Sequence, residues 1–184
     1  MNPVETVEHN GKTIEIYQDE DPINPRENDN ADIMICFHKR YNLGDKHKYN
    51  SDNFNGWSEL DKQLIEDYAP VAIKPLYLYD HSGITISTNP FSCCWDSGQI
   101  GFVLISRETA LYEFSKKKLT KKLKEWAERY IDASVKEYDQ YLTGDVYGYV
   151  IKDENGEETD SCWGFFGMKY AVEEAKSEID YIPA

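Results

Sequence analysis

The sequence lacks a long hydrophobic run, and no stretch approaches the roughly 20 apolar residues that a membrane-spanning helix needs. It also has no CxxC pair, no P-loop, no glycine-rich dinucleotide fingerprint and no GxSxG elbow. The first ten residues, MNPVETVEHN, have neither the basic region nor the apolar core of a secretion signal. We therefore expect a cytoplasmic protein in which the four cysteines are thiols, not disulfides.

Acidic residues dominate what is present, with 34 acidic against 20 basic residues and a formal net charge of −14. This charge favours solubility, disfavours direct contact with nucleic acid or membranes, and suits docking onto a basic protein surface. The one basic cluster, residues 116–124, is interpreted as solvated helix surface. Acidic residues gather in residues 5–32 and 145–180. From these two blocks we predict the following partner-binding carboxylates: Asp19, Glu20, Asp21, Glu157, Glu158 and Asp160.

The length of 184 residues and the 40% apolar content predict a single domain over residues 1–184 with one sizeable core. Alternating residues on both sides of Asn10-Gly11 and of Asn155-Gly156 predict two β-hairpins. Further strands are expected over 33–37, 71–79, 84–88 and 99–106.

Helical periodicity predicts one long helix over residues 119–142, with Thr120 as its cap and Gly144 ending it. Shorter helices are expected over 59–69, capped by Ser58, and over 107–114 and 169–180. Together these elements indicate an α+β fold: a mainly antiparallel sheet built from hairpins, packed on one face against one long and two or three shorter helices.

Reactive side chains concentrate between Pro75 and Gly101, on two turn-like segments between strands. A thiol nucleophile there, Cys93 or Cys94, would need His38 or His81 as base and Asp80 or Asp96 to orient that base. Every histidine precedes these cysteines, whereas in papain-like proteases the histidine follows, so no catalytic residue is assigned. These loops keep open one alternative, that the protein is a small enzyme or a small-ligand binder that uses them, and not a non-enzymatic protein. Trp95 and Trp163 are expected in the core.

A metal site is the other alternative for these residue types. Cys36, His38, His81 and Cys94 are acceptable zinc ligands, and Cys36 and His38 would face the same side of a strand. No closely spaced ligand pair supports the site, so we predict no cofactor and keep zinc as the alternative.

Four segments resemble a family of accessory proteins encoded by tailed phages and prophages, for which no activity, cofactor or catalytic residue is established. They are residues 33–45, 75–102, 138–151 and 160–167. The resemblance implies a phage accessory protein made inside a bacterial cell. Small acidic proteins of this kind resemble counter-defence or host-takeover factors that present carboxylates where a nuclease expects phosphates. The expected partner is therefore a host protein with a basic surface, and the oligomeric state is not indicated.

Overall fold

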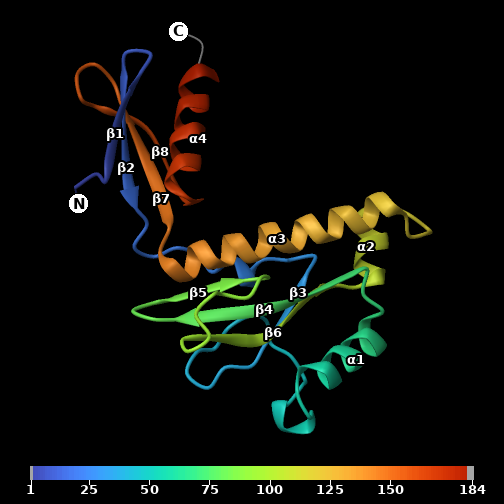
Figure 1. Ribbon diagram of the computed structural model, residues 1–184. Coiled ribbons are helices and arrows are strands. Elements are labelled where there is room, and N and C mark those ends of the chain that lie inside the picture. Colours follow the sequence, from blue (N-terminus) through green and yellow to red (C-terminus); the bar gives the residue numbers. More distant parts are fainter. Residues whose placement is uncertain (1, 182–184) are drawn as a thin grey trace. The chain divides into compact units, whose positions relative to one another are not determined.

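The computed structural model describes residues 2–181, which form two compact units (Figure 1). Unit 1 comprises residues 2–25 and 140–181 of this part, and unit 2 comprises residues 26–139. Over residues 2–181 the chain forms four α-helices and eight strands in two antiparallel sheets, which confirms the α+β class. The strands are divided between two sheets because unit 2 is inserted between the two hairpins of unit 1. The single domain over 1–184 stays a prediction.

Unit 1 is a four-stranded sheet with one helix on one face (Figure 1). The strand order is β1-β2-β7-β8. The core lies under the helix, where Ile14, Ile16 and Ile151 of the sheet meet Ala171 and Ala175. Alternation along the strands places these isoleucines on the helix-facing side. The elements are β1 (Glu5–His9), β2 (Lys12–Gln18), β7 (Val146–Lys152), β8 (Glu158–Phe166) and α4 (Met168–Tyr181).

The two hairpins of unit 1 differ in their turns. Asn10 and Gly11 have φ values of 48° and 77°, so the predicted two-residue turn is confirmed. The second connection is longer than the Asn155-Gly156 pattern predicts, because it runs from Asp153 to Glu157. The Asp153 carboxylate accepts the backbone N–H groups of Asn155 and Glu157, each at 2.9 Å, and so stabilises the loop beside its backbone hydrogen bonds.

Unit 2 contains the second sheet, in the order β3-β6-β4-β5, with helices on both faces (Figure 1). Leu60 and Leu64 of α1 pack with Phe102 and Leu104 on one face, whereas Lys74 on β4 pairs with α3 on the other. The expectation that all helices cover one face is wrong here, because strands β3 and β6 are apolar on both sides. The elements are β3 (Ile33–Cys36), α1 (Trp57–Tyr68), β4 (Ala72–Asp80), β5 (Ile84–Ser87), β6 (Ser97–Ile105), α2 (Arg107–Glu113) and α3 (Lys121–Thr143), which runs on into unit 1.

Two of the three predicted helix-end signals, Thr120 and Gly144, are confirmed. Thr120 Oγ1 accepts the N–H of Leu123 at 3.2 Å, and Gly144, with φ of 73°, follows the end of α3, as predicted. The Ser58 cap is wrong, because α1 begins at Trp57 and is preceded by Gly56, with φ of 99° and no side-chain cap. Among helices of residues 2–181, none is both long and apolar enough to span a bilayer.

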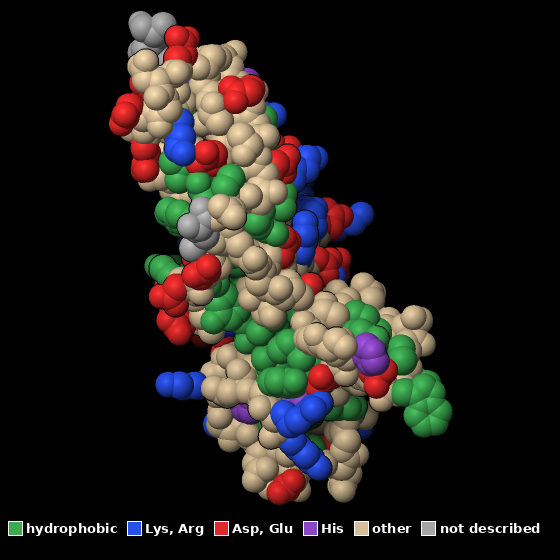
Figure 2. All heavy atoms as spheres, turned by 90° about the vertical axis from the view of Figure 1, so that its left-hand side faces the viewer, with side chains coloured by type: hydrophobic (Ala, Val, Ile, Leu, Met, Phe, Trp, Pro, Cys, Tyr) green, Lys and Arg blue, Asp and Glu red, His purple; other side chains and the backbone are tan. Residues whose placement is uncertain are grey.

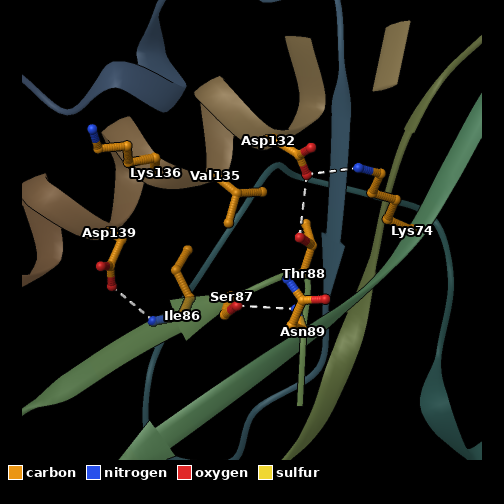
Figure 3. A pocket seen from close by; sticks show the side chains of 9 residues that line it. All are labelled: Lys74, Ile86, Ser87, Thr88, Asn89, Asp132, Val135, Lys136 and Asp139. Atoms are coloured by element: carbon orange, nitrogen blue, oxygen red, sulfur yellow. Dashed lines mark hydrogen bonds and ion pairs between the residues drawn. The ribbon is translucent and has the colours of Figure 1, made fainter. Parts of the chain in front are cut away.

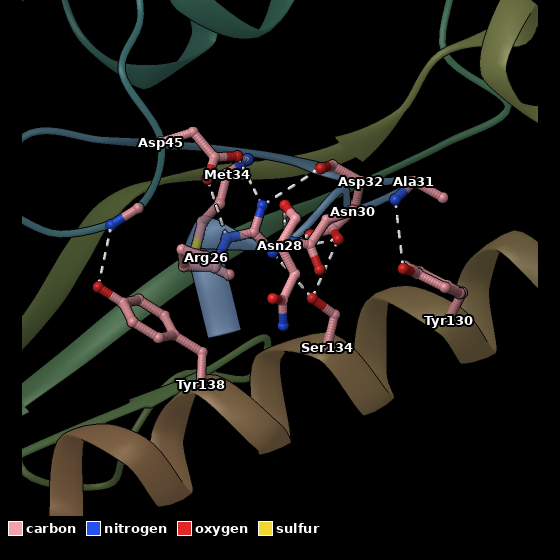
Figure 4. A network of polar contacts seen from close by, with 11 residues as sticks. Arg26, Asn28, Asn30, Ala31, Asp32, Met34, Asp45, Tyr130, Ser134 and Tyr138 are labelled. Atoms are coloured by element: carbon pink, nitrogen blue, oxygen red, sulfur yellow. Dashed lines mark hydrogen bonds and ion pairs between the residues drawn. The ribbon is translucent and has the colours of Figure 1, made fainter. Parts of the chain in front are cut away.

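A buried ionic network ties the segments at the start of unit 2 to α3 (Figure 4). Arg26 Nη1 contacts Asp32 Oδ2 at 3.0 Å, and its Nη2 contacts Asp45 Oδ2 at 2.5 Å. Ser134 of α3 donates to Asp32 Oδ1 at 3.0 Å. Burial raises the pKa of Asp32, against the opposing effects of Arg26 and Ser134. Because the Tyr138 hydroxyl also accepts the N–H of Gly44, the network anchors the loop that leads out of β3.

Candidate functional site

The two reactive loops meet at one end of the unit 2 sheet. Because β6 runs antiparallel to both β3 and β4, the last residues of those strands and the first residues of β6 lie at the same end of the sheet. A cleft of about 580 Å³ opens there, lined by residues 37–40, Leu78, Asp80 and residues 95–100. The structure therefore brings three of the predicted residues together, namely His38, Asp80 and Asp96. The sequence contains these residue types but carries no sign that the loops converge.

Asp80 anchors the loop that follows β3. Its carboxylate accepts hydrogen bonds from Arg40 Nη2 and, at 3.4 Å, from the Tyr41 hydroxyl. Arg40 is 67% exposed, so this ion pair lies at the mouth of the cleft. Both carboxylate oxygens of Asp80 are thus engaged, which makes it a support for residues 38–41 more than a free acid or base.

His38 presents one defined hydrogen-bond donor to the cleft. Its Nδ1 accepts the backbone N–H groups of Arg40 at 3.3 Å and Tyr41 at 3.2 Å. The ring also stacks on Tyr41, with centroids 5.0 Å apart and an interplanar angle of 12°. Because Nδ1 is an acceptor, the neutral ring carries its proton on Nε2.

Asp96 lies between the thiol and the second imidazole. Its Oδ2 is 3.5 Å from His81 Nδ1 and accepts the Cys93 thiol at 3.6 Å. Nucleophilic catalysis requires direct thiol–imidazole contact, and within residues 2–181 no such hydrogen bond is present. Cys94 is exposed and lies outside the cleft lining. The hydrogen-bond partner of the Cys93 thiol is therefore a carboxylate and not an imidazole.

The four residues of the zinc alternative differ in their surroundings, since Cys36 is buried and Cys94 is exposed. Cys36 is buried at the end of β3, and burial raises the pKa of its thiol to about 12. His38 lies beyond the strand end, so the alternation that would place both side chains on one side does not apply. The described chain contains no group of three or more His, Cys, Asp or Glu residues arranged to hold a metal.

A second cavity, of about 540 Å³, lies between β4, β5 and α3 (Figure 3). Its two acidic side chains are engaged within the fold. Asp132 Oδ1 accepts from Lys74 Nζ at 2.7 Å and from Thr88 Oγ1 at 3.2 Å. Asp139 Oδ1 accepts the backbone N–H of Ile86 at 2.8 Å. This cavity therefore marks a polar joint between the sheet edge and α3.

The six predicted partner-binding carboxylates all belong to unit 1, but they form two groups at opposite ends of its sheet. Asp19, Glu20 and Asp21 follow the end of β2, whereas the other three lie at the start of β8. The pairing of Lys152 with Glu158 and of Gln18 with Tyr147 defines these two ends. Seven strand residues separate them, a distance of about 20 Å at roughly 3.3 Å per residue.

The charge of the molecule is concentrated in unit 1. Residues 1–25 and 140–184 contain 16 acidic and four basic residues, a formal charge of −12. Residues 26–139 contain 18 acidic and 16 basic residues, so unit 2 has only −2. On the face seen in Figure 2, acidic side chains are scattered over unit 1 and do not merge into one cluster. This division was hidden in the sequence, because the two acidic segments are far apart in the chain.

The tryptophans expected in the core are instead exposed. Trp95 is 92% exposed at the rim of the cleft, and Trp163 on β8 is 46% exposed. The Trp163 ring lies over Gly148, in the middle of a neighbouring strand. A glycine inside a strand often marks a close approach by another group, so Gly148 was the only indirect sign of this position in the sequence.

Comparison with protein-family models, with curated proteins and with solved structures gives no significant match.

Proposed function

We propose that the protein is a non-enzymatic binding protein whose unit 1 docks on a basic, nucleic-acid-binding surface of a host protein. The observation that carries the proposal is the formal charge of −12 on unit 1, against −2 on unit 2. Glu20, Asp21, Glu157 and Glu158 are exposed, and Asp19 is half-buried. Exposed carboxylates offer a basic surface the negative charge that it otherwise finds in phosphates.

The distance between the two groups of carboxylates indicates how large the basic surface of the partner must be. Two groups about 20 Å apart, at roughly 3.3 Å per strand residue, require an extended basic surface and not a single cationic pocket. Long-range attraction would speed association, and added salt would weaken the complex because exposed charges are screened. Together with the resemblance to phage accessory proteins, this supports a counter-defence or host-takeover role in a bacterial cell.

The test compares two variants with the same total change in charge. In the first, the six predicted carboxylates of unit 1 become amides. In the second, six exposed carboxylates of unit 2 become amides, namely Asp52, Glu66, Glu108, Glu113, Glu125 and Glu128. Each tagged protein is used to capture partners from bacterial lysate at low and high salt, followed by native mass spectrometry.

We expect the wild type and the unit 2 variant to retain the same stoichiometric host protein at low salt and to release it at high salt. The unit 1 variant should lose it. Equal retention by both variants, or no salt-sensitive partner for the wild type, would contradict the proposal.

A second candidate function is small-ligand binding in the cleft of unit 2, and the convergence of the loops favours it. Lys39 and the His38 Nε2–H offer donors to an anion, while the exposed Trp95 indole at the rim offers a stacking surface. The cleft volume of about 580 Å³ is in the range of ligand pockets. The ligand class that fits is a planar molecule with an anionic group.

Adenosine 5′-monophosphate is a suitable first probe for this cleft. We expect saturable changes in the NMR signals of His38 and Trp95, and weaker binding by Lys39→Ala and Trp95→Ala than by the control Lys118→Ala. Lys118 lies outside the cleft and makes the control a matched loss of one exposed charge. Changes that do not saturate, or that are the same in all variants, would eliminate this ligand class.

A further inference from the structure

Trp163 occupies the face of the unit 1 sheet opposite to α4. Along β7, Tyr149 and Ile151 belong to the core under α4, so the intervening and preceding positions, such as Gly148, face the other way. The Trp163 ring lies over Gly148. It is 46% exposed, a large value for an indole on a strand.

A β-bulge directs this side chain. On β7 Tyr147 pairs with Phe165 and Tyr149 pairs with Cys162, so two residues of β8, Trp163 and Gly164, oppose the single Gly148. Gly164 has φ of 89°, as expected for the glycine of such a bulge. Bulges re-aim a side chain locally, and here the indole lies over Gly148 of the neighbouring strand.

Gly148 is required by the ring and not by the backbone. It is absent from the glycines with positive φ, so a larger residue would adopt its backbone conformation without strain. A Cβ added there, however, would overlap the ring atoms Cγ, Cδ2 and Cε3 of Trp163. On the same face the Tyr17 ring lies 6.2 Å from the indole, centroid to centroid. The indole is therefore held in place before any partner binds.

The surroundings of the ring favour a cation. Tyr17 donates to Glu15 at 2.6 Å, and Lys152 pairs with the same carboxylate at 2.7 Å, so this lysine is already engaged. In residues 2–181, no lysine or arginine is positioned over the Trp163 ring. An exposed indole face within a unit of charge −12 attracts a guanidinium or ammonium group by both the ring quadrupole and the net field.

We propose that Trp163, seated on Gly148 beside Tyr17, is the aromatic anchor of the acidic unit and receives an arginine or lysine side chain of the basic partner. This inference rests on the proposed function and specifies its point of contact. A rigid aromatic surrounded by weaker charged contacts is typical of the residues that dominate binding energy at interfaces.

The test uses a nona-arginine peptide as the probe, with affinity measured by calorimetry at several salt concentrations. Trp163→Ala removes the ring, and Gly148→Ala displaces the ring while keeping it in the protein. Tyr112→Ala is the matched control, because Tyr112 is an aromatic residue that is more exposed, at 81%, but lies in unit 2. Near-ultraviolet circular dichroism and thermal midpoints verify that each variant is folded.

We expect Trp163→Ala and Gly148→Ala each to weaken binding about fivefold, with the wild-type salt slope, and Tyr112→Ala to bind as the wild type does. The amide variant of the six unit 1 carboxylates should instead reduce the salt slope. If that variant loses affinity while both ring variants bind normally, the anchor is refuted and the proposed function stands. If the wild type does not bind, or if neutralising the carboxylates changes nothing, the proposed function fails and the anchor with it.

Discussion

Arg26 neutralises the fully buried carboxylate of Asp32 and the partly exposed carboxylate of Asp45. Its side chain is 3% exposed and that of Asp32 is fully buried, so neither group has solvent as an alternative partner. A buried ion pair adds little net stability compared with an apolar replacement of the whole network, but removing one member leaves an uncompensated charge. The residues around Arg26 are therefore sensitive to single substitutions in a way that surface pairs are not.

Replacing Arg26 with methionine should destabilise the protein by about 3–5 kcal/mol at pH 7, because Asp32 and Asp45 lose their shared cation. Chemical denaturation measures this loss. The matched control is Arg40→Met, which breaks an exposed ion pair with Asp80 and should cost less than about 1 kcal/mol.

The deficit of Arg26→Met should shrink as the pH falls. Burial raises the pKa of Asp32, and without the opposing effect of Arg26 it rises further above the unfolded value, so the folded variant takes up this proton first and regains stability as pH decreases. A deficit that stayed constant from pH 7 to pH 4 would show that lost packing, and not buried charge, dominates.

Tyr149 makes the folded state sensitive to alkali. Burial raises its pKa to about 12, and nearby carboxylates, first of all Asp160, act in the same direction. Since an unfolded tyrosine ionises near pH 10, the unfolded state loses its proton first and stability falls from about pH 10 to about pH 12.

Tyr149→Phe removes this titration. Between pH 9 and pH 11 the variant should lose about 1 kcal/mol less of its unfolding free energy than the wild type, as measured by urea denaturation. Tyr181→Phe, at an 85% exposed position on α4, is the matched control and should follow the wild type. Parallel behaviour of Tyr149→Phe and the wild type would contradict the proposed origin of the alkaline loss.

For single residues, the sequence revealed the residue types but not which residues are neighbours in the fold. His38, Asp80 and Asp96 were identifiable as candidates, yet only the strand order shows that they share a cleft. Composition could not show that Asp96 lies between the thiol and the imidazole. Trp163 was expected in the core because large aromatics are usually buried, and the bulge that exposes it depends on pairing with β7.

Among the elements, β5 is an edge strand whose outward backbone is protected by a helix. Asp139 of α3 accepts the N–H of Ile86 at 2.8 Å (Figure 3). It also accepts the Thr85 hydroxyl at 2.7 Å. The carboxylate thus accepts a backbone N–H of the edge strand that would otherwise be open to pairing with another strand. Sheet and helix are joined by this contact and by the Lys74–Asp132 pair beside it.

Asp139→Ala should cost about 1–3 kcal/mol, because it leaves the Ile86 N–H without its acceptor. Asp139→Asn is the matched variant, since an amide oxygen can accept the same hydrogen bond. Hydrogen exchange at the Ile86 amide should accelerate in the alanine variant and remain close to wild type in the asparagine variant. Equal acceleration in both would indicate that the negative charge, and not the acceptor, protects the edge.

Element boundaries were predictable where one local signal decides them. The Asn10-Gly11 turn, the Thr120 cap and the Gly144 helix end all follow from backbone preferences of single residues. The second hairpin is confirmed by the antiparallel pairing of β7 with β8, but its connection is longer than the Asn155-Gly156 pattern predicts because the Asp153 side chain stabilises a five-residue loop. The division into two sheets depends on contacts between segments more than 100 residues apart, which periodicity does not report.

For the whole molecule, the dominant physical feature is the uneven division of charge between the two units. Carboxylates in unit 1 repel one another at low ionic strength, because the Debye length is about 30 Å at 0.01 M salt and about 8 Å at 0.15 M. Unit 2, with a formal charge of −2, has little such repulsion. Salt should therefore stabilise unit 1 more than unit 2.

Hydrogen exchange followed by mass spectrometry tests this at 10 and 150 mM NaCl. We expect exchange in β2 and β7 to slow severalfold with added salt, and exchange in β4 and β6 to change little. The amide variant of the six unit 1 carboxylates should lose much of this response, and the matched unit 2 variant should keep it. An equal response in the slowest amides of both sheets would overturn the prediction, because it would mean that the units open together. That outcome would instead support the single cooperative domain expected from the length of the chain.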